Sequence, residues 1–405
     1  MIDGYSDPMN TVKKAILLSY ISVASASGAI ITPALPAIEK NFNLSMGEVE
    51  WIVTIFLLGY MFGQLLYGPF ANRFGRLPSI RIGFLINIIG ILFSFLAVYL
   101  DSFIGLLLAR FLTSLGAAAG LCCTFTLIHE LLPEEEAKKA LSYSVLSFTL
   151  GIGVSIFIGG VVTEYLYWSA VFWILLIHGA IILASTWQFT ETIDTKVPIH
   201  PKAIFQGYCS VLKSKNLIIY SAIFGTTSVF SYCYSTAAPM VASGFLRINV
   251  AEYGAWNTTI MIGMIVGSIT GAQLIKRMRT YLLVMTSLAL LGVGFLSFLL
   301  QKISLIESNL WFFTTATFLY LIMSWLFPSA SYLALKDMKD RASASGIMNF
   351  INMGVAVLCV AMMGYLPFTS FTALLITLFG YLAFSLALSL FLRKSPNSQN
   401  NITSS

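Results

Sequence analysis

The sequence predicts an all-α integral membrane protein with twelve transmembrane helices arranged as two six-helix halves. Three observations predict it. Of the residues, 58% are hydrophobic and only 10% are charged, whereas soluble domains carry about 25% charged residues. Apolar stretches of about 20 residues, the length that spans a bilayer, recur along the chain. A short basic segment also recurs after about half of the 405 residues, which indicates an internal repeat.

The apolar windows place each helix in turn, because only helices satisfy their own backbone hydrogen bonds in lipid at this length. The first six span residues 12–35, 51–70, 82–99, 104–128, 141–163 and 169–189. The second six span residues 217–242, 253–275, 281–300, 310–334, 342–365 and 371–392. This pattern predicts an N-terminal bundle at 1–190, a cytoplasmic linker at 191–216, and a C-terminal bundle with a short cytoplasmic tail at 217–405.

Lysine and arginine predict the orientation of the helices, because cytoplasmic loops carry an excess of both. Nineteen of the 23 basic residues fall on one side of the predicted bundle. Lys40, Arg247 and Lys302 fall on the other side, and Arg110 lies inside a helix. We therefore expect both termini in the cytoplasm and the chain in a bacterial inner membrane. The net charge of +6 is then a topology signal, not a sign of a nucleic-acid partner.

The internal repeat appears in the loops that follow the second and eighth helices. GPFANRFGR begins at Gly68 and GAQLIKRMR begins at Gly271. Residues 68 and 271 are 203 positions apart, as are residues 76 and 279. An offset of about half the chain predicts two parallel repeats related by an axis along the membrane normal.

Several motifs resemble one family of transporters. GPFANRFGRL at residues 68–77 resembles the loop motif between helices 2 and 3 of the major facilitator superfamily, and RFLTSLGAAAG at residues 110–120 resembles its helix 4 motif. Similarity to the bicyclomycin-resistance (Bcr/CflA-like) branch lies in ITPALPAI from Ile31, YSTAAP from Tyr234, FPSA from Phe327 and ASASGIMNF from Ala342. The resemblance covers essentially the whole chain. It implies the major facilitator fold and secondary active transport of a small organic molecule, as drug-type efflux by alternating access.

The resemblance also implies a conformational latch made of Gly68, Asn72, Arg73, Gly75 and Arg76. The two glycines are expected to let the chain turn at the membrane surface. The two arginines are expected to face the cytoplasm and its anionic headgroups. Plain anchoring by positive charge is the alternative. Asn72 stands where the family usually has an acid, so a charged latch is not expected here.

The acidic residues predict no proton carrier inside the membrane. All 17 map to loops or helix ends. Proton-coupled transporters commonly use a buried carboxylate, but Ala29 stands where this branch usually has an acid in helix 1. We therefore expect no buried acid, and the coupling ion stays open.

Arg110 is the strongest candidate for a substrate-binding residue. An arginine at membrane depth costs about 2.5–3.5 kcal/mol on insertion scales, so it usually has a partner. Binding of an anionic or strongly polar substrate is one interpretation. The alternative is an arginine that braces the fold by hydrogen bonds to carbonyls of helix 1.

Polar and aromatic residues on the other helices expected to line a cavity complete the predicted site. An apolar, aromatic pocket with a few polar groups suits amphiphilic ligands. Two of these residues lie four positions apart and so share one face of helix 2. Packing is the alternative role for every member. The set is Ser27, Tyr60, Gln64, Tyr234, Tyr320 and Asn349.

His178 lies in the middle of predicted helix 6. A neutral imidazole could shuttle protons near physiological pH, which makes it a weak coupling candidate. Helix 6 is usually peripheral in this fold, so a packed or lipid-facing histidine is the alternative.

Other classes of function find no support in the sequence. It contains no phosphate-binding glycine loop and no cluster of His, Cys or acids at metal-ligand spacing. We therefore expect no cofactor, no metal and no enzyme. The expected partners are the lipid bilayer, a small-molecule substrate and a co-transported ion, and the expected oligomeric state is a monomer. Two alternatives remain: a carrier, or importer, of an organic anion such as a metabolite or siderophore, which Arg110 favours, and a non-transporting membrane receptor.

Overall fold

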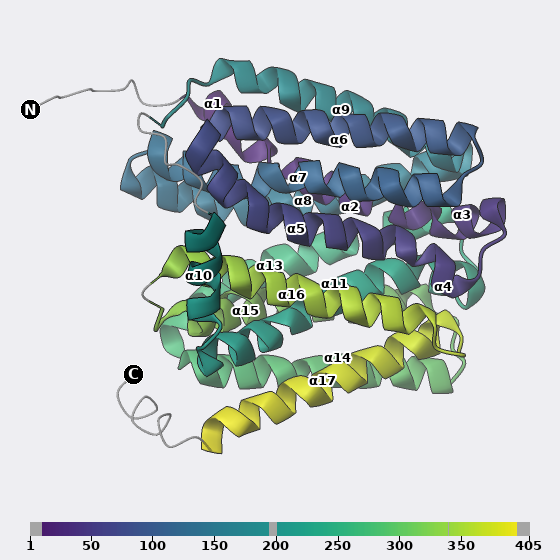
Figure 1. Ribbon diagram of the computed structural model, residues 1–405. Coiled ribbons are helices and arrows are strands. Elements are labelled where there is room, and N and C mark those ends of the chain that lie inside the picture. The colour runs from purple at the N-terminus through teal and green to yellow at the C-terminus, as the bar shows by residue number, and fades with distance from the viewer. Residues whose placement is uncertain (1–9, 194–200, 339, 395–405) are drawn as a thin grey trace, which may run out of the picture.

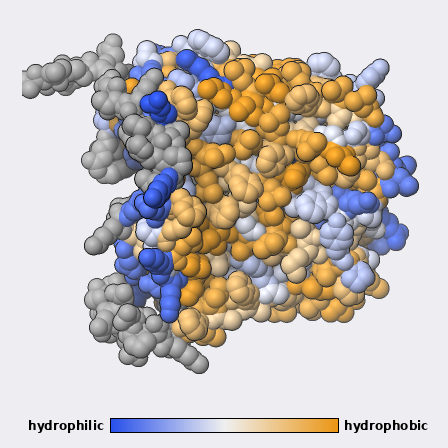
Figure 2. All heavy atoms as spheres, in the orientation of Figure 1, coloured by the Kyte–Doolittle hydropathy of each residue, from blue (hydrophilic) through white to orange (hydrophobic). Residues whose placement is uncertain are grey.

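The computed structural model describes residues 10–193, 201–338 and 340–394. The long helices run roughly parallel, and the N-terminal half is stacked against the C-terminal half (Figure 1). A broad apolar band covers the middle of the molecule, and hydrophilic residues gather at its two ends (Figure 2). This distribution fits a bundle that crosses a bilayer along the helix axes.

The N-terminal half comprises nine α-helices and three short 3₁₀ turns within residues 10–193. In chain order they are α1 (Thr11–Ser19), α2 (Ser22–Ala29), η1 (Thr32–Ala34), α3 (Leu35–Phe42), α4 (Met46–Val49), α5 (Trp51–Phe74), α6 (Arg76–Tyr99), α7 (Phe103–Leu131), α8 (Glu134–Tyr165), η2 (Trp168–Ala170), α9 (Val171–Ser185) and η3 (Thr186–Gln188).

The linker and the C-terminal half follow. The linker contains α10 (Pro201–Val211). The C-terminal helices are α11 (Lys215–Gly244), α12 (Val250–Asn257), α13 (Thr259–Arg277), α14 (Thr280–Ile303), α15 (Asn309–Leu335), α16 (Arg341–Gly364) and α17 (Ser370–Lys394). The predicted tail beyond Lys394, and the basic residues Lys196 and Lys339, lie outside the described residues.

The predicted number of spans is confirmed within the described ranges. Eleven helices are long and apolar enough to cross a membrane, and a twelfth span forms if residues 11–19 and 22–42 are counted as one broken helix. The two parts of that helix are bent by 41°. The chain is therefore a multi-pass membrane protein.

The first span extends farther than predicted. Its predicted end at residue 35 is wrong, because η1 and α3 carry the helix on to Phe42. Pro33 and Pro36 lie at the second positions of η1 and α3. Proline is tolerated there, since the first backbone N–H groups of a helix have no partner inside it.

Other helices also continue past their apolar windows. The prediction that helix 2 ends at residue 70 and that Gly68 lies in a turn is wrong, because α5 continues to Phe74 with Pro69 inside it. α8 begins at Glu134 rather than residue 141. Helices extend into the headgroup region with polar residues, which an apolar window does not detect.

Candidate functional site

The two halves meet mainly along two pairs of helices, with smaller contacts of α8 with α13 and of α3 with α11. α5 packs against α16, and α8 packs against α12. Along the first pair, the Phe62 and Phe350 rings stand edge to face with centroids 6.3 Å apart. The linker helix α10 lies across one end of this pair (Figure 1), where the Tyr208 hydroxyl donates to the Leu65 carbonyl at 3.4 Å. Partial burial raises the pKa of Tyr208, so its phenol stays a protonated donor at neutral pH.

The opposite end, which we call the distal end, is closed by backbone contacts. A Cβ added to Gly160 of α8 would lie 2.7 Å from the Val250 carbonyl oxygen of α12. A Cβ added to Gly47 of α4 would lie 2.8 Å from the Gly364 carbonyl oxygen of α16. Only glycine leaves room for such close approach. The contacts of α8 with α12 and of α4 with α16 therefore depend on glycine at this end.

Arg110 is buried, with 1% of its surface exposed. Its Nη1 donates to the Ser27 carbonyl of α2 at 2.7 Å, and its guanidinium carbon lies 4.4 Å from the centre of the Phe56 ring. The bracing contact to helix 1 therefore exists. Its Nε and Nη2 have no hydrogen-bond partner, so the braced arginine retains two free donors.

The predicted residue Ser27 belongs to this network through its backbone and its side chain. Its hydroxyl accepts a hydrogen bond from the Asn87 amide at 3.2 Å. Asn87 also donates to the Thr113 carbonyl at 2.8 Å. Ser27 therefore links α2, α6 and α7, and its hydroxyl is already engaged.

Tyr60 and Gln64 lie on α5 where it faces the C-terminal half. The Tyr60 hydroxyl and the Gln64 Oε1 are buried without a well-formed hydrogen bond, and the two side chains lie close to each other. Tyr232 on α11 and Cys122 on α7 are near enough to Tyr60 to affect its hydroxyl electrostatically. The structure thus brings these residues together at the junction of the halves, with unused polar atoms.

Tyr234 and Tyr320 pack inside the C-terminal half. Their rings meet edge to face with centroids 5.8 Å apart, and the Tyr234 hydroxyl donates to the Asn257 Oδ1 at 3.2 Å. Phe230 packs against Tyr320 with centroids 5.0 Å apart. Tyr232, which interacts with Tyr60, also interacts with Tyr320. This aromatic cluster therefore adjoins the Tyr60 region.

Asn349 is half-buried on α16, and within the described part of the chain it forms no hydrogen bond. Asn352, one helical turn farther on, is buried with an unpaired Oδ1. Within the described residues, no hydrogen bond links Asn349 to the other predicted site residues.

The hydrogen bonds and ion pair of the predicted latch lie within residues 10–193 of the described structure. Gly75 has φ +109° and links α5 to α6, a conformation that favours glycine. Arg76 pairs with Glu130 of α7 at 3.0 Å and also donates to the Asn72 side chain at 2.5 Å. Arg73 is exposed, and a Cβ on Gly68 would meet no atom within 4 Å. The latch between the halves stays a prediction.

Glu191, which lies outside the predicted latch motif, also stabilises the junction of α5 and α6. The Glu191 carboxylate accepts the backbone N–H groups of Arg76 and Leu77, each at 3.0 Å. It therefore caps the first turn of α6 from the start of the linker, where its negative charge also suits the helix dipole.

His178 faces the first span. Its Nε2 lies 3.0 Å from the Ser22 hydroxyl of α2. This contact joins α9 to the bend of the first span.

The expectation that no buried acid exists is wrong. Glu50 lies at a helix end, where α4 meets α5, but only 3% of its surface is exposed and its Oε2 has no hydrogen-bond partner. The position of Glu50 in the sequence could not show that its side chain is buried, because α16 of the other half packs against it. Gly47, three residues earlier, is the one sequence signal of close packing there.

No group of three or more His, Cys, Asp or Glu side chains within the described ranges could hold a metal ion. The cysteines, free and distributed over α7, α10, α11 and α16, form no such site.

Comparisons with known proteins agree with this architecture. A protein named bicyclomycin resistance protein homolog from Haemophilus influenzae is 24% identical over 64% of this chain and 65% of its own length. The multidrug transporter MdfA of Yersinia pestis is 24% identical over 64% of this chain and 63% of its own length. The chain thus matches slightly less than two thirds of the length of each.

The fold itself is shared with solved transporters. The crystal structure of a D-xylose-proton symporter superposes with a TM-score of 0.78, 14% identity, and coverage of 95% of this chain and 97% of the other. Residues 17–357 match the sequence model of the Major Facilitator Superfamily. Proteins of this family are transporters and not enzymes, and this chain belongs to the Major Facilitator Superfamily.

Proposed function

We propose that this transporter moves a small organic molecule across the membrane by alternating access, and that it exports this molecule in the manner of drug efflux. The observation that carries the proposal is the set of unpaired polar atoms on Tyr60 and Gln64 at the junction of the halves. Each buried unpaired polar atom costs about 1–3 kcal/mol. Such a cost is offset when a substrate or water binds to these atoms during the transport cycle.

The surroundings of these atoms suit an amphiphilic substrate. Tyr232, Tyr234 and Tyr320 supply aromatic faces from the C-terminal half. Few polar groups set among aromatic rings favour mostly apolar ligands with one or two hydrogen-bonding groups. The names of the Haemophilus and Yersinia relatives, which refer to bicyclomycin resistance and to multidrug transport, support export of such compounds.

We also propose that the end carrying α10 faces the cytoplasm, so that the distal end is extracellular and the membrane is the bacterial inner membrane. Lys40, Arg247 and Lys302 lie at ends of α3, α11 and α14 opposite α10. Most basic residues fall at the other end, as the charge rule expects for the cytoplasmic side.

A second candidate is a carrier of an organic anion. The free Nε and Nη2 of buried Arg110 favour it. A guanidinium with unused donors can form a paired hydrogen bond with a carboxylate, which would also supply the missing charge partner.

Cells that lack the gene and cells that overexpress it distinguish the two candidates. Efflux predicts lower drug susceptibility on overexpression, whereas anion import predicts an uptake defect for labelled anions on deletion. Unchanged susceptibility together with unchanged uptake would contradict both.

A matched pair of variants then tests the site. Tyr60→Phe removes the unpaired buried hydroxyl and is expected to lower transport about tenfold, the effect of one hydrogen bond of about 1.4 kcal/mol. Tyr99→Phe removes a hydroxyl from a side chain that is 85% exposed and should leave transport unchanged. Purified protein in liposomes under an imposed pH gradient tests whether protons are the co-transported ion.

A further inference from the structure

Glu50 lies at a contact between the two halves that we call the distal seam: Gly47 and Glu50 on the N-terminal side and Gly364 of α16 on the other. A Cβ added to Gly364 would lie 2.5 Å from the Glu50 Oε2 and 2.9 Å from the Gly47 Cα. The carboxyl group is therefore packed directly against the backbone of the opposite half. With the seam closed as in this structure, the carboxyl group is buried.

No positive charge compensates the carboxylate within the described part of the chain. Glu50 forms no ion pair there, and its Oε2 has no hydrogen-bond partner. Glu48 is turned toward the Ser45 backbone N–H and hydroxyl, at 2.8 and 2.7 Å. Toward the distal end, the surrounding elements carry these titratable groups: Glu39 and Lys40 on α3, Glu48 on α4, Cys233 on α11, Cys359 on α16, and Tyr365 directly after α16.

None of these groups pairs with Glu50. Cys233 interacts with it electrostatically, but as a buried neutral thiol it supplies no countercharge. Tyr365 accepts a hydrogen bond from the Trp51 indole at 2.9 Å across the same seam. An unpaired ionised carboxylate in such a place is strongly unfavourable, and protonation removes most of that cost.

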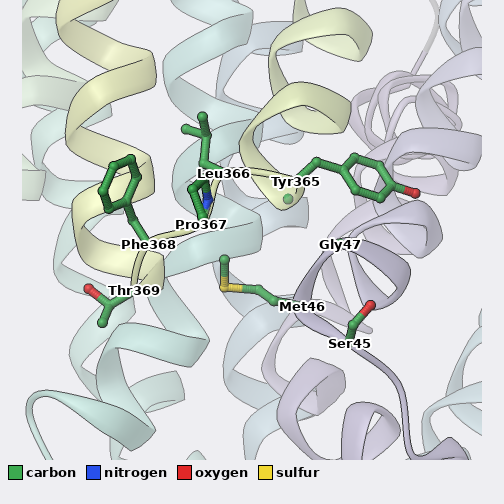
Figure 3. A pocket seen from close by; sticks show the side chains of 9 residues that line it. Ser45, Met46, Gly47, Tyr365, Leu366, Pro367, Phe368 and Thr369 are labelled. Carbon is green, nitrogen blue, oxygen red and sulfur yellow. The ribbon is translucent and has the colours of Figure 1, made fainter.

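A pocket gives the solution at the distal end access to the seam. It has a volume of about 570 Å³ and is lined by residues 45–47 of one half and 364–369 of the other. Figure 3 shows the Met46, Tyr365 and Phe368 side chains around it. Gly47 and Gly364, which form its wall, are the residues packed on Glu50. Parting of these two glycines would connect the carboxyl group to water in the pocket.

We propose that Glu50 is a proton-binding site that controls the distal seam: the protonated acid allows the seam to close, and the ionised carboxylate holds it open in water. The inference rests on the alternating access and orientation proposed above. The proton enters from the distal solution and returns to it. It therefore sets the balance between the open and closed states and is not itself carried across the membrane.

The sign of the pH dependence follows from proton linkage. The closed seam holds the proton on Glu50, and the open seam releases it to water. Closure is therefore complete at low pH and is lost as pH rises. With one proton linked, the closed-to-open ratio falls by up to about tenfold per pH unit in the titration range.

Spin-label distances across the seam test the proposal in full-length protein in nanodiscs, without substrate. Labels at Lys40→Cys and Phe368→Cys report the separation of the halves at exposed positions, in a background where the native cysteines are replaced. The expected result is a population shift toward the longer distance between pH 5.5 and pH 8.5. Glu50→Gln, which mimics the protonated acid, should keep the short distance with less than about a twofold change in population.

Two further variants complete the test. Glu48→Gln removes a nearby exposed charge, and glutamine also serves in a capping box, so its pH response should match that of the parent. Glu50→Asp should retain a pH response with a displaced midpoint, which keeps the test decisive if Glu50→Gln does not fold. A pH response that persists unchanged in Glu50→Gln, or no pH response in the parent, overturns the proposal. Because no substrate is present, either result leaves the proposed efflux to be judged by the susceptibility assay.

Discussion

Replacement of Arg110 separates a bracing role from a binding role, because the structure shows both satisfied and unsatisfied donors on one guanidinium. Arg110→Ala removes the hydrogen bond to the Ser27 carbonyl, which is worth about 1.5–3 kcal/mol for a charged donor. It also removes the contact with the Phe56 ring, worth up to about 2 kcal/mol in a desolvated place.

Arg110→Ala also removes a free-energy cost of the folded state. Nε and Nη2 are buried without partners, and each such group costs about 1–3 kcal/mol. The losses and the relief are of similar size, so the net change in the free energy of unfolding is expected to stay within about 2 kcal/mol. At about 2–4 °C per kcal/mol, Tm should move by less than about 8 °C.

Transport should respond much more strongly. If the two free donors bind a substrate anion, their loss removes about 3 kcal/mol or more of charge-assisted hydrogen bonding, which corresponds to roughly a hundredfold weaker affinity. Arg110→Lys keeps the positive charge but lacks the paired N–H donors of the guanidinium, so about a tenfold loss of affinity is expected. The assay is uptake of labelled anions into liposomes, alongside thermal unfolding of the same preparations.

One pattern would refute this reasoning. If Arg110→Ala lowers Tm by more than about 10 °C and transport falls only in proportion to the unfolded fraction, the arginine braces the fold and binds nothing. Normal transport by both variants would likewise remove Arg110 from the site.

Three further substitutions, one of them with a matched control, test other parts of the structure. Gly160→Ala places a Cβ 2.7 Å from a backbone carbonyl of α12 and should destabilise the closed distal end by about 1–3 kcal/mol, seen as a longer spin-label distance. Gly380→Ala, where a Cβ meets nothing within 4 Å, is its control and should not change that distance. Glu191→Ala removes the cap of α6 and should cost about 0.5–2 kcal/mol, measured as a lower Tm with transport per folded molecule retained; an unchanged Tm would contradict the capping role. His178→Gln can keep a hydrogen bond to Ser22, so the pH profile of transport should stay the same. A shifted profile would support a role of His178 in proton coupling.

The sequence was sufficient for features that depend on the chemistry of single segments. Long apolar windows predict transmembrane spans because each apolar helix is stable in lipid by itself: it satisfies its own backbone hydrogen bonds and is long enough to cross the bilayer. Motifs at residues 68–77 and 110–120 indicated the family, which the match over residues 17–357 confirmed. Helix ends were less accurate, as at Phe42 and Phe74, because they depend on capping and headgroup contacts more than on hydropathy.

The site depended on contacts between segments far apart in the chain. Tyr60 and Gln64 were predicted as one face of a helix, but their lack of partners follows from the surroundings of α5, which packs against α7 and α16. A carbonyl of helix 1 was one of two alternatives for the partner of Arg110, and only the tertiary structure shows that this contact forms while two nitrogens of the guanidinium stay unpaired.

Glu50 and Arg110 show where the boundary lies. The sequence by itself determined that one is a helix-end acid and the other an arginine at membrane depth, because span position follows from local hydropathy. The tertiary structure alone decided that Glu50 is buried against Gly364 of the other half. Burial and pairing of a charge depend on which surfaces meet, and in a two-half transporter those surfaces are separated by more than three hundred residues of chain.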